Sequence, residues 1–282
     1  MIRNKMKDFE ELFKNISSEY VSIYSVKENR IIYNKQGDFD CFPASITKVM
    51  NALTALKYAS VDLECVVGEE QEVMKRSPDP SLAHIVKGEK WRLGDLLYAS
   101  LLPSGNDAAY AIGYNVINNM TEYKDLTVLE KCEMFAKLMN DYALELGCKN
   151  THFVTLDGND YVDKRLVNHL TSTNDLCLIF NEALKYKDLI EVMSTYQKDI
   201  VIGDKLYKFE NGNDLINPKS DNYNPMVIGG KTGMTCPANY CLGSIGKNEK
   251  NGEIYIVICC YSYVNNNKYL DSNKIYNYLF EE

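Results

Sequence analysis

Histidine, tryptophan and paired cysteines are scarce in this sequence. Its 282 residues include one tryptophan, nine cysteines and three histidines, which are His84, His152 and His169. The cysteines form no CxxC pair, so the spacing typical of a zinc site is missing. Their odd number, and the adjacent Cys259 and Cys260 in an apolar stretch, favour buried thiols over a dense disulfide framework. We therefore expect neither a metal nor another cofactor.

Basic charge and long apolar runs are scarce as well. Lys and Arg number 31 against 39 Asp and Glu, which gives a net charge of -8. Nucleic-acid binding depends on clustered Lys and Arg, so we expect no nucleic-acid partner. No run approaches the roughly 18 apolar residues of a spanning helix, and the opening MIRNKMKDFEELFKN is too charged for a signal-peptide core. Any membrane association is expected only through segments absent from this chain.

The sequence has enough apolar residues, 45%, to bury one large core, and we expect a single domain over residues 1–282. Apolar periodicity predicts helices at about 8–16, 45–59, 93–118, 126–146, 171–184 and 270–280. Runs rich in β-branched and aromatic residues predict strands at 20–26, 30–34, 206–209, 227–231, 240–245 and 254–263. Residues 69–80 are expected to form a loop or an irregular strand.

The order of these elements predicts an α/β fold of the α+β kind. Strands at both ends of the chain, with helices between them, indicate one mostly antiparallel sheet and an all-helical lobe. The sheet lobe is expected to comprise about 1–44 and 200–282, and the helical lobe about 45–199.

The first candidate site is the SITK run at 45–48. Residues three apart share a helix face, so the Ser45 hydroxyl and the Lys48 amine lie within reach of each other. A serine hydroxyl is a weak nucleophile, and a desolvated lysine with a lowered pKa can take its proton. Ser244 and Lys247 have the same spacing near a predicted strand end. The first pair is favoured because it opens an apolar helix, whose N-terminal amides can face the reacting oxygen.

The second candidate site interrupts the helical pattern of residues 93–118. Pro103-Ser104-Gly105-Asn106 stands between two apolar segments, and this break directs the polar side chains out of the helical lobe towards a cleft. A similar SxN pattern at Ser172 is interpreted as a helix cap.

The third candidate site is the KTG triplet at 231–233. It follows the run Val227-Ile228-Gly229-Gly230, which predicts a strand with small residues and one basic side chain. Glycine there lets a substrate backbone come close. An extended peptide could lie along such a strand edge, with its carboxylate near Lys231 and the Thr232 hydroxyl.

In this order the three motifs resemble the signature of the penicillin-recognising serine enzymes. The resemblance extends over about residues 21–280 and is to the low-molecular-mass D-alanyl-D-alanine carboxypeptidases, peptidase family S11 of the serine β-lactamase-like superfamily. It includes PASITK at 43–48 with LTAL at 53–56, LLPSGNDAA at 101–109, KNTHF at 149–153, HLTS at 169–172 and KTGMT at 231–235. It implies a β-lactamase/transpeptidase-like fold, with a five-stranded sheet flanked by helices.

The resemblance also implies roles for the first two motifs. Ser45 would be the acylated nucleophile and Lys48 its general base. Ser104 would relay a proton to the leaving D-alanine, and Asn106 would hold the substrate amide and the lysine. His152 and His169 are interpreted as structural residues.

For the third motif the resemblance implies substrate binding and oxyanion stabilisation. Lys231 and Thr232 would bind the terminal carboxylate, and Lys231 is also counted among the catalytic residues. Gly233 and Met234 would also bind the substrate. The backbone N–H groups of Ser45 and Met234 would form the oxyanion hole. The substrate implied is a peptidoglycan stem peptide ending in D-Ala-D-Ala, and β-lactams would be covalent inhibitors. The location implied is extracytoplasmic, at the cell surface or in the periplasm.

Two positions depart from the family pattern. The loop at 155–159 reads TLDGN where the family usually has a sequence like NPHGL. The segment 263–268, after the last predicted strand, lacks the arginine that many members use to hold the substrate carboxylate.

Two alternatives stay open at this point. A β-lactamase of the same fold is one, although no Glu-x-x-Leu-Asn-like segment follows Asn106, and the middle triplet is SGN instead of SDN. A non-catalytic module that recognises wall peptides is the other, although the motif residues are intact.

Overall fold

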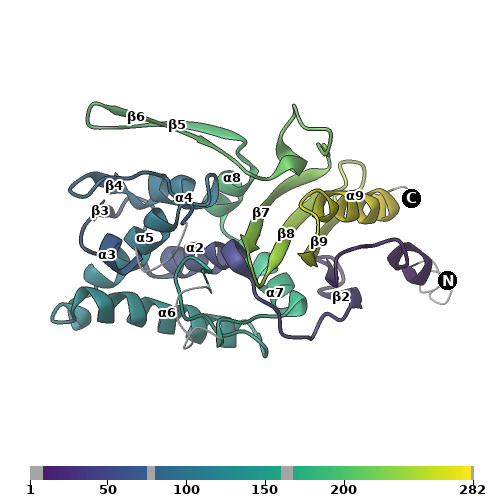
Figure 1. The fold of residues 1–282 in the computed structure, drawn as a ribbon, viewed down its shortest axis with the longest axis horizontal. Coiled ribbons are helices and arrows are strands. Elements are labelled where there is room, and N and C mark those ends of the chain that lie inside the picture. The colour runs from purple at the N-terminus through teal and green to yellow at the C-terminus, as the bar shows by residue number, and fades with distance from the viewer. Residues whose placement is uncertain (1–8, 75–79, 160–167, 281–282) are drawn as a thin grey trace.

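One five-stranded antiparallel sheet organises the molecule (Figure 1). The structure, a computed structural model, describes residues 9–74, 80–159 and 168–280. The sheet has the order β2-β1-β9-β8-β7, and all neighbours in it are antiparallel. Its strands are β1 (Tyr20–Ser25), β2 (Arg30–Lys35), β7 (Val227–Thr235), β8 (Asn239–Lys247) and β9 (Ile254–Ser262). The predicted fold class is confirmed.

The two ends of the chain meet inside this sheet. Ile23 on β1 pairs with Val257 on β9, so an N-terminal strand lies beside a C-terminal one. β7 is the last strand of the sheet, so one edge of its backbone has no strand neighbour among the described residues. The KTG triplet lies on this strand.

Helices cover both faces of the sheet (Figure 1). On one face α9 (Asn267–Phe280) packs on β8 and β9, and its Tyr276 is fully buried. On the other face α7 (Thr173–Ala183) packs on β1 and β9, and α2 (Thr47–Tyr58) packs on α7. The sheet therefore separates a small apolar cluster under α9 from the main core.

The helical part is built around α5 (Asn106–Asn118). This helix packs against α2 and against α4 (Leu93–Leu101), α6 (Val128–Glu145) and α3 (Glu70–Met74). Its residues are almost all buried, so the apolar periodicity of the sequence corresponds to a central helix.

Local signals in the sequence explain where these helices start and stop. α6 starts with a capping box in which Thr127 and Glu130 exchange hydrogen bonds, and Gly147, with φ +88°, follows its end. α7 starts at the cap Ser172, whose side chain accepts a hydrogen bond from the backbone of Asp175. The prediction of a cap at Ser172 is confirmed.

Shorter elements connect the main ones. They are η1 (Ala44–Ile46), β3 (Glu64–Val66), β4 (Lys90–Arg92), η2 (Thr121–Tyr123), α8 (Lys187–Ser194), β5 (Gln197–Ile202), β6 (Lys205–Glu210) and η4 (Asp214–Ile216).

Some predicted elements differ from the structure. The strand expected at 206–209 is not in the main sheet, because β5 and β6 pair only with each other. This hairpin extends over the helical part (Figure 1), where the Tyr207 ring packs on Trp91 with centroids 4.8 Å apart.

Two predictions for helical or loop segments also differ from the structure. The stretch 69–80, expected to be loop or irregular strand, contains α3, and its residues 75–79 lie outside the described residues. The predicted helix at 8–16 is helical only over 9–13 within the described residues.

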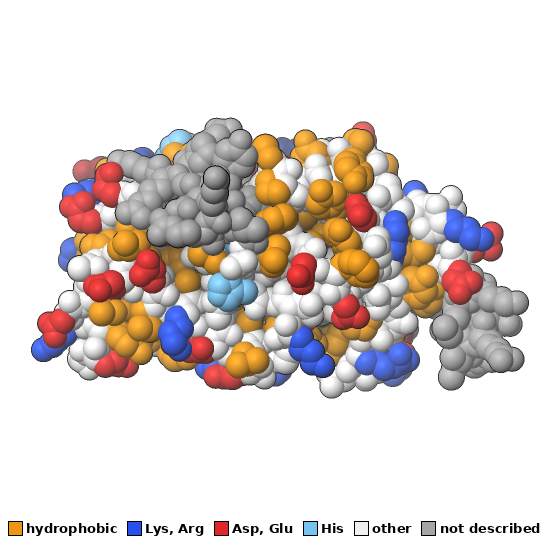
Figure 2. Space-filling view, turned by 60° about the horizontal axis from the view of Figure 1, so that its bottom comes forward, with side chains coloured by type: hydrophobic (Ala, Val, Ile, Leu, Met, Phe, Trp, Pro, Cys, Tyr) orange, Lys and Arg blue, Asp and Glu red, His pale blue; other side chains and the backbone are white. Residues whose placement is uncertain are grey.

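One face of the molecule carries charges of both signs (Figure 2). On the face in Figure 2, described basic side chains are scattered among acidic and hydrophobic ones and form no continuous basic area. Within the described ranges, no helix combines the length and apolar character that a membrane crossing requires.

Candidate active site

Ser45 lies in η1, one turn before the helix that carries Lys48. The prediction had Ser45 opening the α-helix, but α2 begins at Thr47. The residue before the serine, Ala44, has a φ of +47°, which is uncommon for a residue other than glycine. Ser45 remains partly accessible while its neighbours in α2 are buried. The turn therefore presents the hydroxyl at the surface of an otherwise buried segment.

The Lys48 amine is the centre of the hydrogen-bond network. It contacts Ser45 Oγ at 2.8 Å, Asn106 Oδ1 at 2.9 Å and the carbonyl oxygen of Asp157 at 2.8 Å. Its side chain has no solvent exposure. Three separate segments of the chain therefore converge on one nitrogen.

Burial changes the acidity of Lys48. Desolvation disfavours the ammonium form and lowers the pKa of Lys48 to about 8, although the nearby carboxylates of Asp157 and Asp107 act in the opposite direction. A substantial fraction of the amine is then neutral near physiological pH. The geometry and the acidity together fit a proton acceptor for Ser45.

Ser104 lies in the break between α4 and α5, as the sequence predicted. It has a φ of +63°, a strained conformation that turns the side chain away from the helical path. The next residue, Gly105, has no room for a side chain, since a Cβ there would lie 2.6 Å from the Ala99 carbonyl oxygen. Asn106 then starts α5 and directs its Oδ1 at Lys48.

Lys231 joins the sheet to this break. Its side chain is buried, and its amine donates to Ser104 Oγ at 3.0 Å and to the Thr232 carbonyl at 2.9 Å. Burial, together with the nearby charge of Lys48, lowers the pKa of Lys231 well below its usual value. The two lysines therefore face one shared, water-poor region.

The rest of the KTG strand lies against η1, the turn that carries Ser45. A Cβ on Gly233 would be 2.9 Å from the Pro43 carbonyl and 3.2 Å from the Ser45 nitrogen, so only glycine permits this approach. Thr232 is partly buried, and Met234 is 62% exposed. All eight predicted site residues thus lie on the three segments that meet here.

The competing pair is placed differently. Ser244 is buried within β8, and its hydroxyl contacts the Tyr276 hydroxyl and the Val257 carbonyl. These partners belong to the layer under α9, so the Ser244 hydroxyl is buried on that side of the sheet.

Sequence reasoning missed the backbone contribution of residues 153–159, which we call the cleft loop. Asp157 supplies its carbonyl to Lys48, and Gly158, with φ +87°, lies so close that a Cβ would be 1.8 Å from the Ala44 carbonyl. The departure from the family pattern at 155–159 was the signal that this loop borders the site. Every residue has a main-chain carbonyl, so the amino-acid sequence could not predict which carbonyl contacts Lys48.

The histidines of the family-like segments are tied into the structure. His152 Nδ1 contacts the Asn168 carbonyl at 3.0 Å. His169 is fully buried and contacts the cleft loop and Thr47.

No arginine follows the last strand, but a buried cation does. The Lys268 amine lies over the rings of Tyr240 and Tyr269, at 5.2 and 4.2 Å from their centroids, and donates to the Asn265 carbonyl. Desolvation lowers the pKa of Lys268 to about 8. Tyr240 pairs with Met234 across the sheet, so one of the rings under this lysine belongs to the strand beside the KTG triplet.

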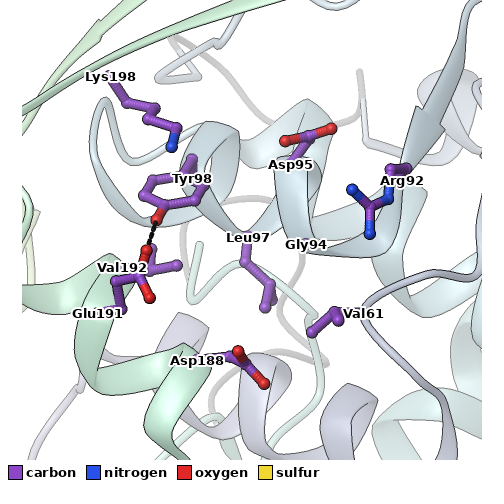
Figure 3. A pocket seen from close by; sticks show the side chains of 10 residues that line it. All are labelled: Val61, Arg92, Gly94, Asp95, Leu97, Tyr98, Asp188, Glu191, Val192 and Lys198. Carbon is purple, nitrogen blue, oxygen red and sulfur yellow. Dashed lines mark hydrogen bonds between the residues drawn. The ribbon is translucent and has the colours of Figure 1, made fainter.

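A cavity of about 180 Å³ lies away from these residues, between α4, α8 and β5 (Figure 3). In it the Tyr98 hydroxyl donates to Glu191 at 3.2 Å, and the Lys198 amine lies above the Tyr98 ring. None of the motif residues lines it, so it is separate from the candidate active site.

Comparison with known proteins agrees with this geometry. A family model described as D-alanyl-D-alanine carboxypeptidase matches residues 7–260. The chain belongs to this family. The predicted family is confirmed, while the hydrolase activity and the role of each site residue stay predictions.

Two curated relatives and one solved structure illustrate the similarity. D-alanyl-D-alanine carboxypeptidase DacF of Bacillus subtilis is 29% identical over 232 residues, which are 81% of this chain and 54% of that protein. The D-alanyl-D-alanine carboxypeptidase of Streptomyces sp. K15 is 29% identical over 221 residues, 75% of this chain and 70% of that one. The crystal structure of the Streptomyces K15 DD-transpeptidase superposes with a TM-score of 0.82 at 25% identity and covers 95% of this chain and 98% of its own. The chain thus spans about half the length of the Bacillus relative.

Proposed function

We propose that this chain is a serine-type D-Ala-D-Ala carboxypeptidase that removes the terminal D-alanine from peptidoglycan stem peptides. The observation that carries the proposal is the 2.8 Å contact between Ser45 Oγ and a buried lysine amine whose pKa is about 8. Residues 1–282 act as one catalytic domain, because the sheet part and the helical part each supply half of the site.

In the acylation step, neutral Lys48 takes the Ser45 proton while Oγ attacks the carbonyl carbon of the penultimate D-alanine. The backbone N–H groups of Ser45 and Met234 hold the developing oxyanion. The peptide C–N bond then breaks, and the proton taken by Lys48 reaches the leaving amine through the Ser104 hydroxyl.

Lys231 and Thr232 hold the carboxylate of the leaving D-alanine. Asn106 accepts from Lys48 through Oδ1, and its NH2 group donates to the carbonyl of the substrate amide. In the deacylation step, Lys48 takes a proton from water, which attacks the ester carbonyl, and Lys48 returns this proton to Ser45 Oγ as the ester bond breaks. β-Lactams also form an ester with Ser45, but the amine of the opened ring remains part of the acyl group, so the product stays attached as a covalent adduct. Because the substrate is cell-wall peptide, the enzyme acts outside the cytoplasm.

The test is D-alanine release from a synthetic stem peptide ending in D-Ala-D-Ala, measured with wild type and Ser45→Ala. We expect release from the wild type and a fall of at least about 1,000-fold in the variant, since the nucleophile is lost. A wild type that binds the peptide but releases no D-alanine would instead favour a recognition module. A wild type that turns over a chromogenic cephalosporin faster than about once per second would favour a β-lactamase.

A further inference from the structure

One hydrogen-bond partner of Lys48 comes from outside the three motifs. It is the Asp157 carbonyl, 2.8 Å from the amine. A neutral amine has two N–H bonds and one lone pair. When Asn106 Oδ1 and this carbonyl accept both N–H bonds, the lone pair is left facing the Ser45 hydroxyl, as proton transfer requires. The position of the cleft loop therefore decides how the base is oriented.

The cleft loop is tethered to the helical part at three points. Asn140 on α6 accepts from the Phe153 nitrogen at 2.7 Å and donates to the Phe153 carbonyl at 2.8 Å. Asn51 on α2 donates to the Leu156 carbonyl at 3.0 Å. The third tether is the ring of His169.

The His169 ring connects the cleft loop directly to α2, the helix that carries Lys48. Nδ1 accepts from the backbone N–H groups of Val154 at 2.9 Å and Thr155 at 3.3 Å. Because Nδ1 accepts, the proton of the neutral ring is on Nε2, which donates to Thr47 Oγ1 at 2.9 Å. Thr47 is the first residue of α2 and directly precedes the candidate base. One buried ring therefore fixes both sides of the contact between the base and the loop carbonyl.

We propose that His169 is a positioning residue for acyl transfer, which holds the Asp157 carbonyl in place against the Lys48 amine. This rests on the proposed function, because it concerns the same acylation step. The histidine contacts neither substrate nor nucleophile, and acts only through the cleft loop and Thr47. Its loss slows acylation without weakening the binding of the substrate carboxylate by Lys231 and Thr232.

Two matched substitutions separate the halves of this tether. An asparagine at 169 places its amide oxygen near the position of Nδ1, so His169→Asn keeps an acceptor for the loop N–H groups. A glutamine reaches the position of Nε2, so His169→Gln keeps only the link to Thr47. If the loop contact is the important one, the asparagine variant retains more acylation than the glutamine variant.

The experiment measures benzylpenicillin acylation by stopped flow, separating the non-covalent dissociation constant from the acylation rate constant. We expect His169→Gln and His169→Ala to lose roughly tenfold to a hundredfold in the rate constant, because a misplaced group near the reacting atoms has this effect. His169→Asn should stay within about threefold of wild type, and all dissociation constants within about twofold. Asp271→Asn, which removes buried hydrogen bonds under α9 far from the loop, is the control for general destabilisation.

Each result decides one of two questions. A wild type that forms no adduct overturns the proposed function, whereas a wild type that acylates allows the variants to be interpreted. A wild-type rate constant in His169→Ala, equal losses in the asparagine and glutamine variants, or a loss shared by the control overturns the positioning role. If the His169 variants do not fold, Val154→Pro tests the loop contact, because it removes the backbone N–H group that donates to His169 Nδ1 at 2.9 Å. A fall of tenfold or more at an unchanged dissociation constant supports the positioning role, and a wild-type rate constant overturns it.

Discussion

At the scale of single residues, the site depends on two lysine amines held away from water. Desolvation lowers the pKa of both Lys48 and Lys231, and the charge of one also opposes the charge of the other. Lys48 additionally has two carboxylates nearby that favour its charged form. The result is a lysine poised between its two protonation states, which is the condition for a base near neutral pH.

The pH dependence of acylation follows from this. With a pKa of about 8, Lys48 changes from mostly charged to mostly neutral between pH 7 and 9, so the acylation rate should rise over this range. Lys48→Arg keeps the charge but cannot act as a base, and should lower the rate constant by about 1,000-fold or more. Rate constants for penicillin acylation at several pH values test both statements. A flat profile in the wild type, or an active arginine variant, would contradict them.

A second prediction at this scale concerns His169 and the pH dependence of folding stability. Burial first, and the nearby His152 second, lower the pKa of His169 to about 3. The unfolded chain binds this proton near pH 6.5, so folding stability is fully present above that pH and falls as the pH drops towards 3. At pH 5 this one residue should cost about 2 kcal/mol. Urea unfolding at pH 7 and pH 5 should show a smaller pH effect in His169→Asn, and an equal effect would refute the assignment.

At the scale of elements, the site is formed where a strand meets a turn. β7 lies beside η1 because Gly233 has no side chain, and this closeness brings the KTG triplet to Ser45. The helix break at Ser104 and the cleft loop complete the enclosure from the helical side. The residues of the candidate site are thus held by backbone approach as much as by side-chain contact.

Gly233→Ala tests this approach. Its Cβ would meet the Pro43 carbonyl at 2.9 Å and the Ala44 Cβ at 3.1 Å, so strand and turn must separate. We expect an acylation rate at least about tenfold lower and a stability loss of about 1–3 kcal/mol. Gly94→Ala in α4 is the control, because its Cβ would have only ordinary contacts. Acylation by Gly233→Ala at the rate of this control would argue against the close approach.

At the scale of the whole molecule, the chain is closed by contacts between its two ends. The Asp271 carboxylate on α9 accepts hydrogen bonds from the backbone and side chains of Ser17 and Ser18, at 2.7 to 3.2 Å. The Phe9 and Tyr278 rings also pack against each other, with centroids 5.0 Å apart. This layer supports the sheet from the side opposite the active site.

Asp271→Asn should therefore separate stability from activity. One amide oxygen cannot replace all the hydrogen bonds of the carboxylate, so we expect a loss of about 1–3 kcal/mol in the free energy of unfolding. The acylation rate per folded molecule should stay unchanged, because no site residue contacts Asp271. Thermal unfolding and penicillin titration of the same sample measure both, and a slower site in the folded variant would contradict this division.

The sequence predicted the fold class and the three motifs, because these depend on local patterns. Apolar periodicity located the helices around Ser104, and the β-branched runs located β1, β8 and β9. The hairpin of β5 and β6 was missed as a separate sheet, since period-two patterns do not say which strand pairs with which. The cleft-loop carbonyl and its His169 tether were also missed, because they are tertiary contacts of main-chain atoms.

The central claim is that one hydroxyl, activated by a buried lysine, carries the acyl group. Its most direct test is intact-mass analysis of the enzyme after exposure to benzylpenicillin, followed by peptide mapping of the adduct. We predict a single addition on the peptide that contains Ser45, and no addition to Ser45→Ala. An adduct on another residue, or an equal adduct on the variant, would contradict the account.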